Sequence, residues 1–355
     1  MLRVDEHVGA SAFEQLQVEW EDLADRAPDT TPFQTWRLAR GAWRMNQDTV
    51  VPRVFAVRES GGRAVAILPI GMTRGGLRPL QHTEARSIAP GLLDDTGVLV
   101  DAAHSTAIVD TVATILQRLR REGHLIDIRP IPATNPLAIA SERLGSPFRN
   151  IRLPANPVGA LPSPPGSWEQ VVLDAHTRSE VRRSARRLQD TLGMTTLVAT
   201  TDVEIRFLVD GLIPLHVAAQ ALKGRVSKLA SAAAMAWFAP FMIELHARGE
   251  AEGIGLVSPD HQVIAAVFFV RHRGRATLIR SAFDPEYRSF SPGLVALAAA
   301  MDRAIALGDR EVSFGPGAEA YKTHWATPAE EYVRLTCLPR TPRYLMARAW
   351  QRVRG

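Results

Sequence analysis

The sequence predicts an α/β protein of two similar halves, each a mixed, mostly antiparallel sheet flanked by helices. Two observations support this prediction. Helical and strand-like patterns alternate along the whole chain, and the order of elements in the first half returns in the second half. A segment rich in proline and glycine, residues 154–166, separates the halves. We therefore expect one domain over residues 1–153, a linker over 154–166 and a second domain over 167–340.

The elements of each half follow from the period of their apolar residues and from their end signals. In the second half, an arginine-rich helix ends at Gly193 and is followed by strand, helix, helix, three strands, helix, strand, short helix and strand. The expected ranges are 194–200, 202–222, 231–247, 254–258, 263–271, 275–283, 292–307, 311–314, 319–325 and 332–338. In the first half, helices are expected at 12–27, 35–46, 105–122 and 136–144, and strands at 53–59, 63–73, 77–88 and 125–129.

Composition limits the class of protein. The chain has 355 residues, of which 46% are hydrophobic and 22% charged, as in soluble globular proteins. No apolar run is expected to approach the roughly 18 residues that span a bilayer. The single cysteine, Cys337, excludes an internal disulfide framework and a cysteine-built zinc site, so we expect a cytoplasmic protein. The ten histidines lack metal-ligand spacing, and we expect no metal.

The net charge of +5 is concentrated in two segments. Residues 178–187 hold five arginines and one glutamate, and residues 340–355 hold five arginines and no acid. The rest of the chain is therefore net negative, and a nucleic-acid-binding surface is not expected. Like charges on two helical turns repel, which favours an anionic partner over a solvated face. From this helix we expect three substrate-binding residues, Arg182, Arg183 and Arg186.

The basic C-terminus, residues 341–355, is predicted to be a helix. Aromatic and aliphatic residues alternate with its arginines. Two interpretations stay open, a terminal helix that docks on a domain and a peripheral contact with an anionic membrane surface.

The most informative local motif joins a strand to an amphipathic helix at residues 283–293. Ser291 and Gly293 are small and let backbone N–H groups approach an anion, while Pro292 suits the first turn of a helix. A pyrophosphate is the natural ligand of such a turn, and Arg288 adds a charged donor. An ordinary strand-to-helix turn is the alternative interpretation.

This motif, Arg288-x-x-Ser291-x-Gly293, resembles the pyrophosphate loop of the GNAT acyltransferase superfamily, with Ser291 in place of the first glycine. Further segments resemble a bacterial branch of that superfamily, which is associated with cellulose and exopolysaccharide synthesis and related to Fem-type peptidyltransferases. They are Arg182-Arg183-x-x-Arg186-Arg187-Leu188, Leu215-His216, Ala282-Phe283-Asp284-Pro285, Ser291-Pro292-Gly293, Phe314-Gly315-x-Gly317, Tyr321-Lys322-x-x-Trp325, Trp20-x-x-Leu23 and Thr31-Pro32-Phe33-Gln34-Thr35-Trp36. Ser313 and Ala318 depart from the acidic residues expected beside the Gly-x-Gly segment.

The resemblance implies two tandem GNAT-like domains and direct transfer from acetyl-CoA or another acyl-CoA. The implied acceptor is an amine or hydroxyl of a sugar, a polysaccharide precursor or a small metabolite. The second half is expected to hold the acyl-CoA and the first half to shape the acceptor side. A backbone N–H near residues 282–284 is expected to stabilise the thioester oxygen. The implied cofactor-binding residues are Ala282, Phe283, Arg288, Ser291, Pro292 and Gly293.

Direct transfer also needs an acid and a base. Tyr321 is predicted to protonate the leaving thiolate, because a phenol with a pKa of ~10 keeps its proton at neutral pH; packing beside Trp325 is the alternative. His216 and Asp284 are the candidate bases. Lys322 is expected to join the three arginines in binding substrate.

Two other functions remain open. A Fem-type aminoacyl transfer from charged tRNA would need room for a long helical arm, yet only residues 223–230 separate the two central helices. A catalytically silent GNAT-like binding module is favoured by Ser291, Ser313 and Ala318. The sequence leaves the acyl chain, the acceptor and the oligomeric state open.

Overall fold

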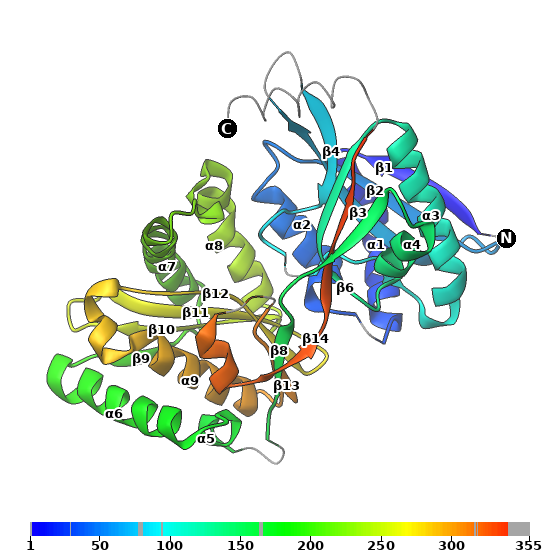
Figure 1. Ribbon diagram of the computed structural model, residues 1–355. Coiled ribbons are helices and arrows are strands. Elements are labelled where there is room, and N and C mark those ends of the chain that lie inside the picture. The colour runs from blue at the N-terminus through cyan, green and yellow to red at the C-terminus, as the bar shows by residue number, and fades with distance from the viewer. Residues whose placement is uncertain are drawn as a thin grey trace. The chain divides into compact units, whose positions relative to one another are not determined.

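The computed structural model describes residues 2–28, 30–76, 81–93, 95–162, 166–315, 317 and 319–339. The chain folds into two compact units, Met1–Pro154 with Glu331–Gly355, and Ala155–Glu330. Each unit has a central mixed sheet with helices packed on it (Figure 1). The predicted α/β class with two flanked sheets is therefore confirmed. The predicted basic C-terminal helix, residues 341–355, lies outside the described residues.

The first unit is built on an eight-stranded sheet in the order β1-β2-β3-β4-β6-β15-β7, with β5 paired to β3. All described pairs are antiparallel except β4 with β6, which are parallel and joined through helix α3. The strands are β1 (Arg3–Val8), β2 (Val51–Arg58), β3 (Ala64–Gly75), β4 (His82–Ser87), β5 (Leu99–Val100), β6 (Leu125–Pro132), β7 (Phe148–Arg152) and β15 (Tyr332–Cys337). The helices are α1 (Ser11–Arg26), α2 (Trp36–Arg44), α3 (Ser105–Arg121) and α4 (Pro136–Leu144).

The second unit is built on a seven-stranded sheet in the order β14-β8-β13-β12-β11-β10-β9. Its one parallel pair among the described strands is β12 with β13, which are joined through helix α9. The strands are β8 (Asn156–Ala160), β9 (Thr195–Val198), β10 (Ala251–Val257), β11 (Val263–His272), β12 (Arg275–Phe283), β13 (Glu311–Ser313) and β14 (Thr327–Glu330). The helices are α5 (Trp168–Val171), α6 (Ala175–Leu192), α7 (Asp202–Leu222), α8 (Ala232–His246) and α9 (Pro292–Ala306), with 3₁₀ helices η3 (Lys228–Ala230), η4 (Pro285–Phe290) and η5 (Ala320–His324).

The two sheets share one topology. Counted from β1 or from β9, four antiparallel strands follow one another, a helix crosses over, and a fifth strand joins in parallel. Two more strands follow in each sheet, and in the first sheet β5 is added beside β3. The repeat of element order seen in the sequence is therefore a repeat of topology.

The structure corrects the predicted domain boundaries. Strand β8 lies inside the predicted linker, where it pairs with β13 and β14. The predicted strand at 332–338 exists as β15, yet it pairs with β6 and β7 of the first unit. Its Val333, Leu335 and Cys337 enter the first unit's core. Alternation of apolar residues predicts a strand but does not say which sheet it joins, so the chain passes between the units twice instead of once.

Two helix layers cover the second sheet (Figure 1). Residues of α6 and α9 share one apolar core with β10, β11 and β12. On the other face α7 comes so close that a side chain at Gly255 would lie 2.4 Å from Leu208, and one at Gly211 would lie 2.4 Å from Val263. Glycine at these two positions is what permits the approach.

Helix α7 is more apolar than the sequence prediction allowed. Its 21 residues reach a mean hydropathy of 1.3 over an 18-residue window, enough by length and composition to cross a membrane. Four of its side chains, Ile205, Leu208, Val209 and Leu212, are nevertheless buried within the unit. We therefore describe α7 as a surface helix of the second unit.

Candidate active site

The second unit contains a cavity of about 880 Å³. This volume lies in the range of small-molecule and cofactor sites. A cavity in the first unit, beside Trp20 and Phe33, measures about 10 Å³, room for a single water. The residues that line the large cavity are His176, Thr177, Glu180, His216, Ala219, Gln220, Lys223, Ala266, Val267, Ser281, Ala282, Phe283, Arg288, Ser291, Gly293, Leu294, Leu297, Glu319, Ala320, Tyr321 and His324.

One wall of the cavity is the open edge of β12. The parallel pairing of β12 with β13 ends at Thr277 and Ser313, whereas β12 continues to Phe283. Three consecutive residues, 281–283, line the cavity. Because successive side chains of a strand point to opposite faces, a run of three means that the cavity meets β12 along its edge. Backbone groups of that edge are thus available to a ligand, as expected for a thioester beside Ala282.

The strand-to-helix turn forms a second wall. Helix η4 ends at Ser291, whose φ of 51° is left-handed, and α9 begins at Pro292. Arg288, Ser291 and Gly293 line the cavity, while Pro292 is buried and begins the helix. The first N–H groups of a helix lack intrahelical partners, so this start offers donors and a positive dipole end to an anion.

Gly293 has a steric role at this helix start. A Cβ atom at this position would lie 2.9 Å from Cδ1 of Phe283, closer than carbon atoms approach in proteins. Glycine therefore lets α9 begin directly against the end of β12, where both residues reach the cavity.

Helix α6 also contacts the turn, through Glu180 and Arg187, neither of which was predicted as a site residue. Ser291 Oγ donates a hydrogen bond to Glu180 Oε1 at 2.9 Å. The Arg187 guanidinium lies 4.4 Å from the centre of the Phe290 ring and donates to the Ser289 carbonyl at 3.2 Å. One arginine of the basic helix thus supports the turn.

His216 lines the cavity from α7. Its Nδ1 lies 2.8 Å from Oγ of Ser227, a buried residue whose Oγ also accepts the Leu229 N–H at 3.1 Å. Burial, followed by the positive charges of Arg280 and Lys223, lowers the pKa of His216 to about 4. The ring is therefore neutral at neutral pH and free to accept a proton, although it is a weak base.

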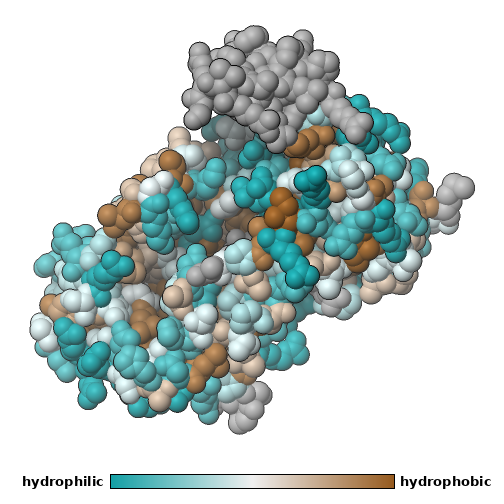
Figure 2. Space-filling model, in the orientation of Figure 1, coloured by the Kyte–Doolittle hydropathy of each residue, from teal (hydrophilic) through white to brown (hydrophobic). Residues whose placement is uncertain are grey.

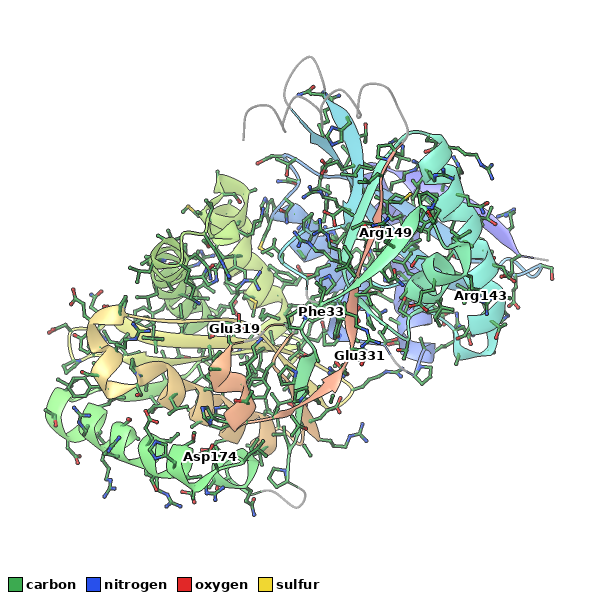
Figure 3. All side chains as sticks on the ribbon, in the orientation of Figure 1. Phe33, Arg143, Arg149, Asp174, Glu319 and Glu331 are labelled. Carbon is green, nitrogen blue, oxygen red and sulfur yellow. The ribbon has the colours of Figure 1, made fainter. Side chains whose placement is uncertain are left out.

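A second imidazole, His324, reaches the cavity from η5 and was missed by the sequence analysis. Its Nδ1 lies 3.0 Å from Oδ2 of Asp174, and its carbonyl accepts the Leu173 N–H at 2.8 Å. The other carboxylate oxygen of Asp174 accepts the Thr177 N–H at 2.7 Å at the start of α6. Figure 3 labels Asp174 beside that helix.

The charge state of Asp174 determines the tautomer of His324. The hydrogen bond from the Thr177 backbone, with smaller contributions from the Thr177 side chain and His324, lowers the pKa of Asp174 to about 2. An ionised carboxylate can only accept hydrogen bonds, so Nδ1 of His324 must carry the proton. In the neutral ring the lone pair is then on Nε2. No backbone or sequence pattern linked these residues, because 150 positions separate them.

Tyr321 lies one 3₁₀ turn before His324 in η5, and both side chains line the cavity. Residues three apart in a 3₁₀ helix lie on the same side. Trp325 is fully buried and packs against Trp168, with ring centres 6.3 Å apart. Tyr321, a residue 37% exposed, therefore lines the cavity and does not pack in the core beside Trp325, and its role as the acid stays a prediction.

Lys322 does not take the position predicted for a substrate-binding residue. It is buried, and its Nζ donates to the Gly315 carbonyl at 2.9 Å and pairs with Glu319 Oε2 at 2.9 Å. Burial would raise the pKa of Glu319, but the hydrogen bond and charge of Lys322 outweigh it, and the pKa of Glu319 lies below its ordinary value. The consequence is an ionised carboxylate, Glu319, at the cavity wall (Figure 3).

The predicted arginines also lie elsewhere. Helix α6 lines the cavity through His176, Thr177 and Glu180. At about 100° per residue, Arg182 and Arg186 point well away from that face. Arg182 pairs with Glu169, and Arg186 Nε lies 3.4 Å from the Arg182 carbonyl. Arg183 is exposed and is likewise not among the residues at the cavity.

Asp284 is a turn residue in the structure. Its carboxylate accepts the Glu286 N–H at 2.9 Å at the start of η4. It is not among the described residues that line the cavity, so its predicted role as a base has no support from its position. No group of three histidine, cysteine or acidic side chains suited to a metal occurs among the residues that the structure describes.

Comparison with known proteins matches this unit to a family. Residues 175–323 match the family model of the acetyltransferase (GNAT) domain. Among solved structures, FemX superposes with a TM-score of 0.62 at 12% identity, covering 93% of this chain and 98% of that one. A tandem GNAT protein from the clavulanic acid biosynthesis pathway superposes with a TM-score of 0.53 at 15% identity, covering 95% of this chain and 98% of that one. The chain has a tandem GNAT-like fold.

The L-PGS structure from Bacillus licheniformis shares this fold, with a TM-score of 0.54 at 10% identity over 93% of this chain and 96% of that one. None of the proteins with curated functions matches the sequence. The cavity residues from His176 to Tyr321 lie within the matched segment, and His324 follows it directly. These similarities establish the fold, while donor and acceptor have to be argued from the cavity itself.

Proposed function

We propose that the second unit transfers an acyl group from acetyl-CoA, or another acyl-CoA, directly to an amine or hydroxyl acceptor. The observation that carries the proposal is the 880 Å³ cavity, where the open edge of β12 and the start of α9 meet. In an elongated acyl-CoA thioester, the acyl arm can bind along the backbone edge of β12, and the pyrophosphate can bind at the start of α9.

The donor's anionic end fits the residues at the turn. Arg288 and the first N–H groups of α9 supply positive potential, and Gly293 keeps the helix start free of a side chain. The Glu180 carboxylate beside Ser291 works against an anion, so we place the phosphates at Arg288 and Gly293 and not at the Ser291 hydroxyl.

The bond changes in the transfer are few. The acceptor's lone pair attacks the thioester carbon, a proton leaves the acceptor, the carbon–sulfur bond breaks, and the departing thiolate takes up a proton. A backbone N–H along residues 281–283 is suited to stabilise the oxygen anion of the intermediate. Tyr321 is suited to protonate the thiolate.

For the base we favour His324 over His216. The Asp174 carboxylate fixes the His324 tautomer that leaves Nε2 free, and its negative charge stabilises the imidazolium that forms. His216 has a pKa of about 4 and sits between positive charges, which oppose protonation. His216 then positions the acceptor through a hydrogen bond from or to its Nε2.

The association with cellulose or exopolysaccharide synthesis and the cytoplasmic location stay predictions from the sequence.

The acidic pair Glu180 and Glu319 at the cavity favours an acceptor with a cationic or hydroxyl-rich group. An amino sugar or a small amine meets this requirement.

The test is release of free CoA thiol. The purified chain is incubated with acetyl-CoA and a panel of amino sugars, polyols and small amines. Acceptor-dependent thiol release supports the proposal. If acetyl-CoA raises the melting temperature but no acceptor releases thiol, a silent binding module is favoured. If aminoacyl-tRNA and not acyl-CoA is consumed, the Fem-type alternative holds.

A further inference from the structure

Helix α7 has charged residues only in its first half, up to Asp210, yet its buried residues also all lie in that half. Of the 18-residue window with mean hydropathy 1.3, 28% is buried. The buried residues end at Leu212, and none of residues 213–222 is buried. The second half of the helix therefore presents apolar surface that the unit covers only in part.

This uncovered surface continues into the loop and the start of α8. Leu222 is 75% exposed, Val226 88% and Met235 52%. The loop between the helices folds back on α7, because Ser227 contacts His216 and the Arg225 N–H donates to the Gln220 carbonyl at 2.9 Å. Residues 221–236 thus form one end of the helix pair, which we call the α7–α8 tip.

The charges of the tip have one sign. Lys223, Arg225 and Lys228 are all exposed. From Gly211 to Ile243 the sequence contains no aspartate or glutamate. Figure 2 shows hydrophobic residues at the surface on the side where α7 and α8 lie, next to hydrophilic ones.

Exposed aliphatic side chains flanked by cations suit a lipid surface with negative headgroups. The apolar side chains enter the boundary between headgroups and acyl chains, and the cations meet the headgroup charge. A second copy of the chain fits less well, because a two-fold contact would bring the same three positive charges together. A nucleic acid would leave Leu222, Val226 and Met235 without an apolar environment.

We propose that the α7–α8 tip docks the protein on an anionic lipid bilayer. Ala219, Gln220 and Lys223 belong to the same helix end and line the cavity, so docking brings the cavity wall to the bilayer surface. An acceptor carried on a membrane lipid then has direct access. This last step rests on the proposed acyl transfer, whereas docking itself does not.

The experiment is co-sedimentation of the full chain with vesicles. One set contains phosphatidylcholine alone and the other phosphatidylcholine with phosphatidylglycerol. We expect binding to the mixed vesicles that weakens as salt is added. The double variant Arg225→Gln/Lys228→Gln should lower the binding constant by about 10-fold or more, since each cation near an anionic surface contributes roughly 5-fold. The double variant Leu222→Ser/Val226→Ser should also lower it by about 10-fold or more, because it removes the apolar side chains that enter the bilayer.

The matched control lies at the other end of the same helix. Val203 is 77% exposed and Arg206 is exposed, and both lie outside the tip. Val203→Ser/Arg206→Gln should bind like the wild type. Melting temperatures of all variants check that the fold is retained, as expected for exposed positions.

Four results would overturn the proposal. The first three are no binding to mixed vesicles, equal binding to neutral vesicles, and wild-type binding by both tip variants. The fourth is that inorganic phosphate releases the bound protein more strongly than sodium chloride does at equal ionic strength. The last result would indicate a phosphate site. If the protein does not bind vesicles but self-associates in the ultracentrifuge, and the tip variants abolish this self-association, the tip would be a contact between copies. Since sedimentation requires no turnover, its outcome is independent of the acyl-transfer test.

Discussion

The Nδ1 atom of His324 lies 3.0 Å from Oδ2 of Asp174, whose other oxygen accepts the Thr177 N–H at 2.7 Å. One carboxylate thus begins helix α6 and orients an imidazole at the cavity. Because the backbone hydrogen bond holds the Asp174 pKa near 2, the carboxylate keeps this double role throughout the neutral range.

Asp174→Asn separates the two roles. Asparagine caps a helix about as well as aspartate, so stability should change little. Its amide can also donate to Nδ1 and has no charge to stabilise an imidazolium, so kcat should fall by about 10² or more with unchanged acetyl-CoA affinity. Asp190→Asn, at an exposed position of the same helix, is the control. Equal turnover of the two variants in the thiol-release assay would remove Asp174 and His324 from the mechanism.

Tyr321→Phe tests the acid. The change removes one oxygen and keeps the ring, so the melting temperature should hold while kcat falls by about 10² or more. A donor whose thiol is more acidic needs less help in leaving, so the deficit should shrink with such a thioester. An equal deficit with both donors would mean that the variant misplaces the donor and does not lack an acid.

His216 should make stability depend on pH. Its folded pKa is about 4, below the value of about 6.5 in an unfolded chain. As the pH falls from about 6.5 to about 4, the unfolded state takes up this proton first, so stability is lost across that window and is fully present above it. His216→Asn should show a shallower loss in urea unfolding over the same range. Parallel curves for both proteins would mean that the ring is not shielded from solvent.

Lys322 is predicted to matter for stability more than for binding. Lys322→Met leaves the Gly315 carbonyl and the Glu319 carboxylate without their partner, which should cost about 1–3 kcal/mol in urea unfolding. Arg182→Met breaks an ion pair at the surface and should change the unfolding midpoint little. Similar losses in both variants would contradict the structural role given to Lys322.

Much of the fold could be predicted because local signals agreed with it. Helix α7 and strand β12 lie where the spacing of their apolar residues predicts them, although Thr201 caps α7 where the sequence favoured Asp202. Strand β8 lies in a segment predicted as linker because it contains Pro157 and Gly159 and has four more prolines around it within residues 154–166. Strand β15 joins the first sheet by pairing with strands far away in the sequence, and a local pattern cannot predict such pairing.

The turn was predictable because it is continuous in sequence, and His216 and Tyr321, named one by one from the resemblance and their chemistry, also line the cavity. The turn at 283–293 brings Arg288, Ser291 and Gly293 to the cavity as expected. The pairs Asp174–His324 and Glu180–Ser291 join residues far apart in the chain, so no local pattern predicts them. The arginines of α6 were predicted to bind substrate, but the face of α6 at the cavity carries His176, Thr177 and Glu180.

The central claim is that the second unit binds an acyl-CoA at the start of α9. Gly293→Asp forces a side chain against Phe283 and adds a negative charge where the phosphates are placed. Gly61→Asp is the control, since a side chain there meets nothing within 4 Å.

The most direct measurement is calorimetric titration of the wild type and both variants with acetyl-CoA. We predict one site per chain in the wild type and in Gly61→Asp, and at least a roughly 100-fold weaker affinity in Gly293→Asp with its melting transition retained. Wild-type affinity in Gly293→Asp, or no heat of binding in the wild type, would contradict the account.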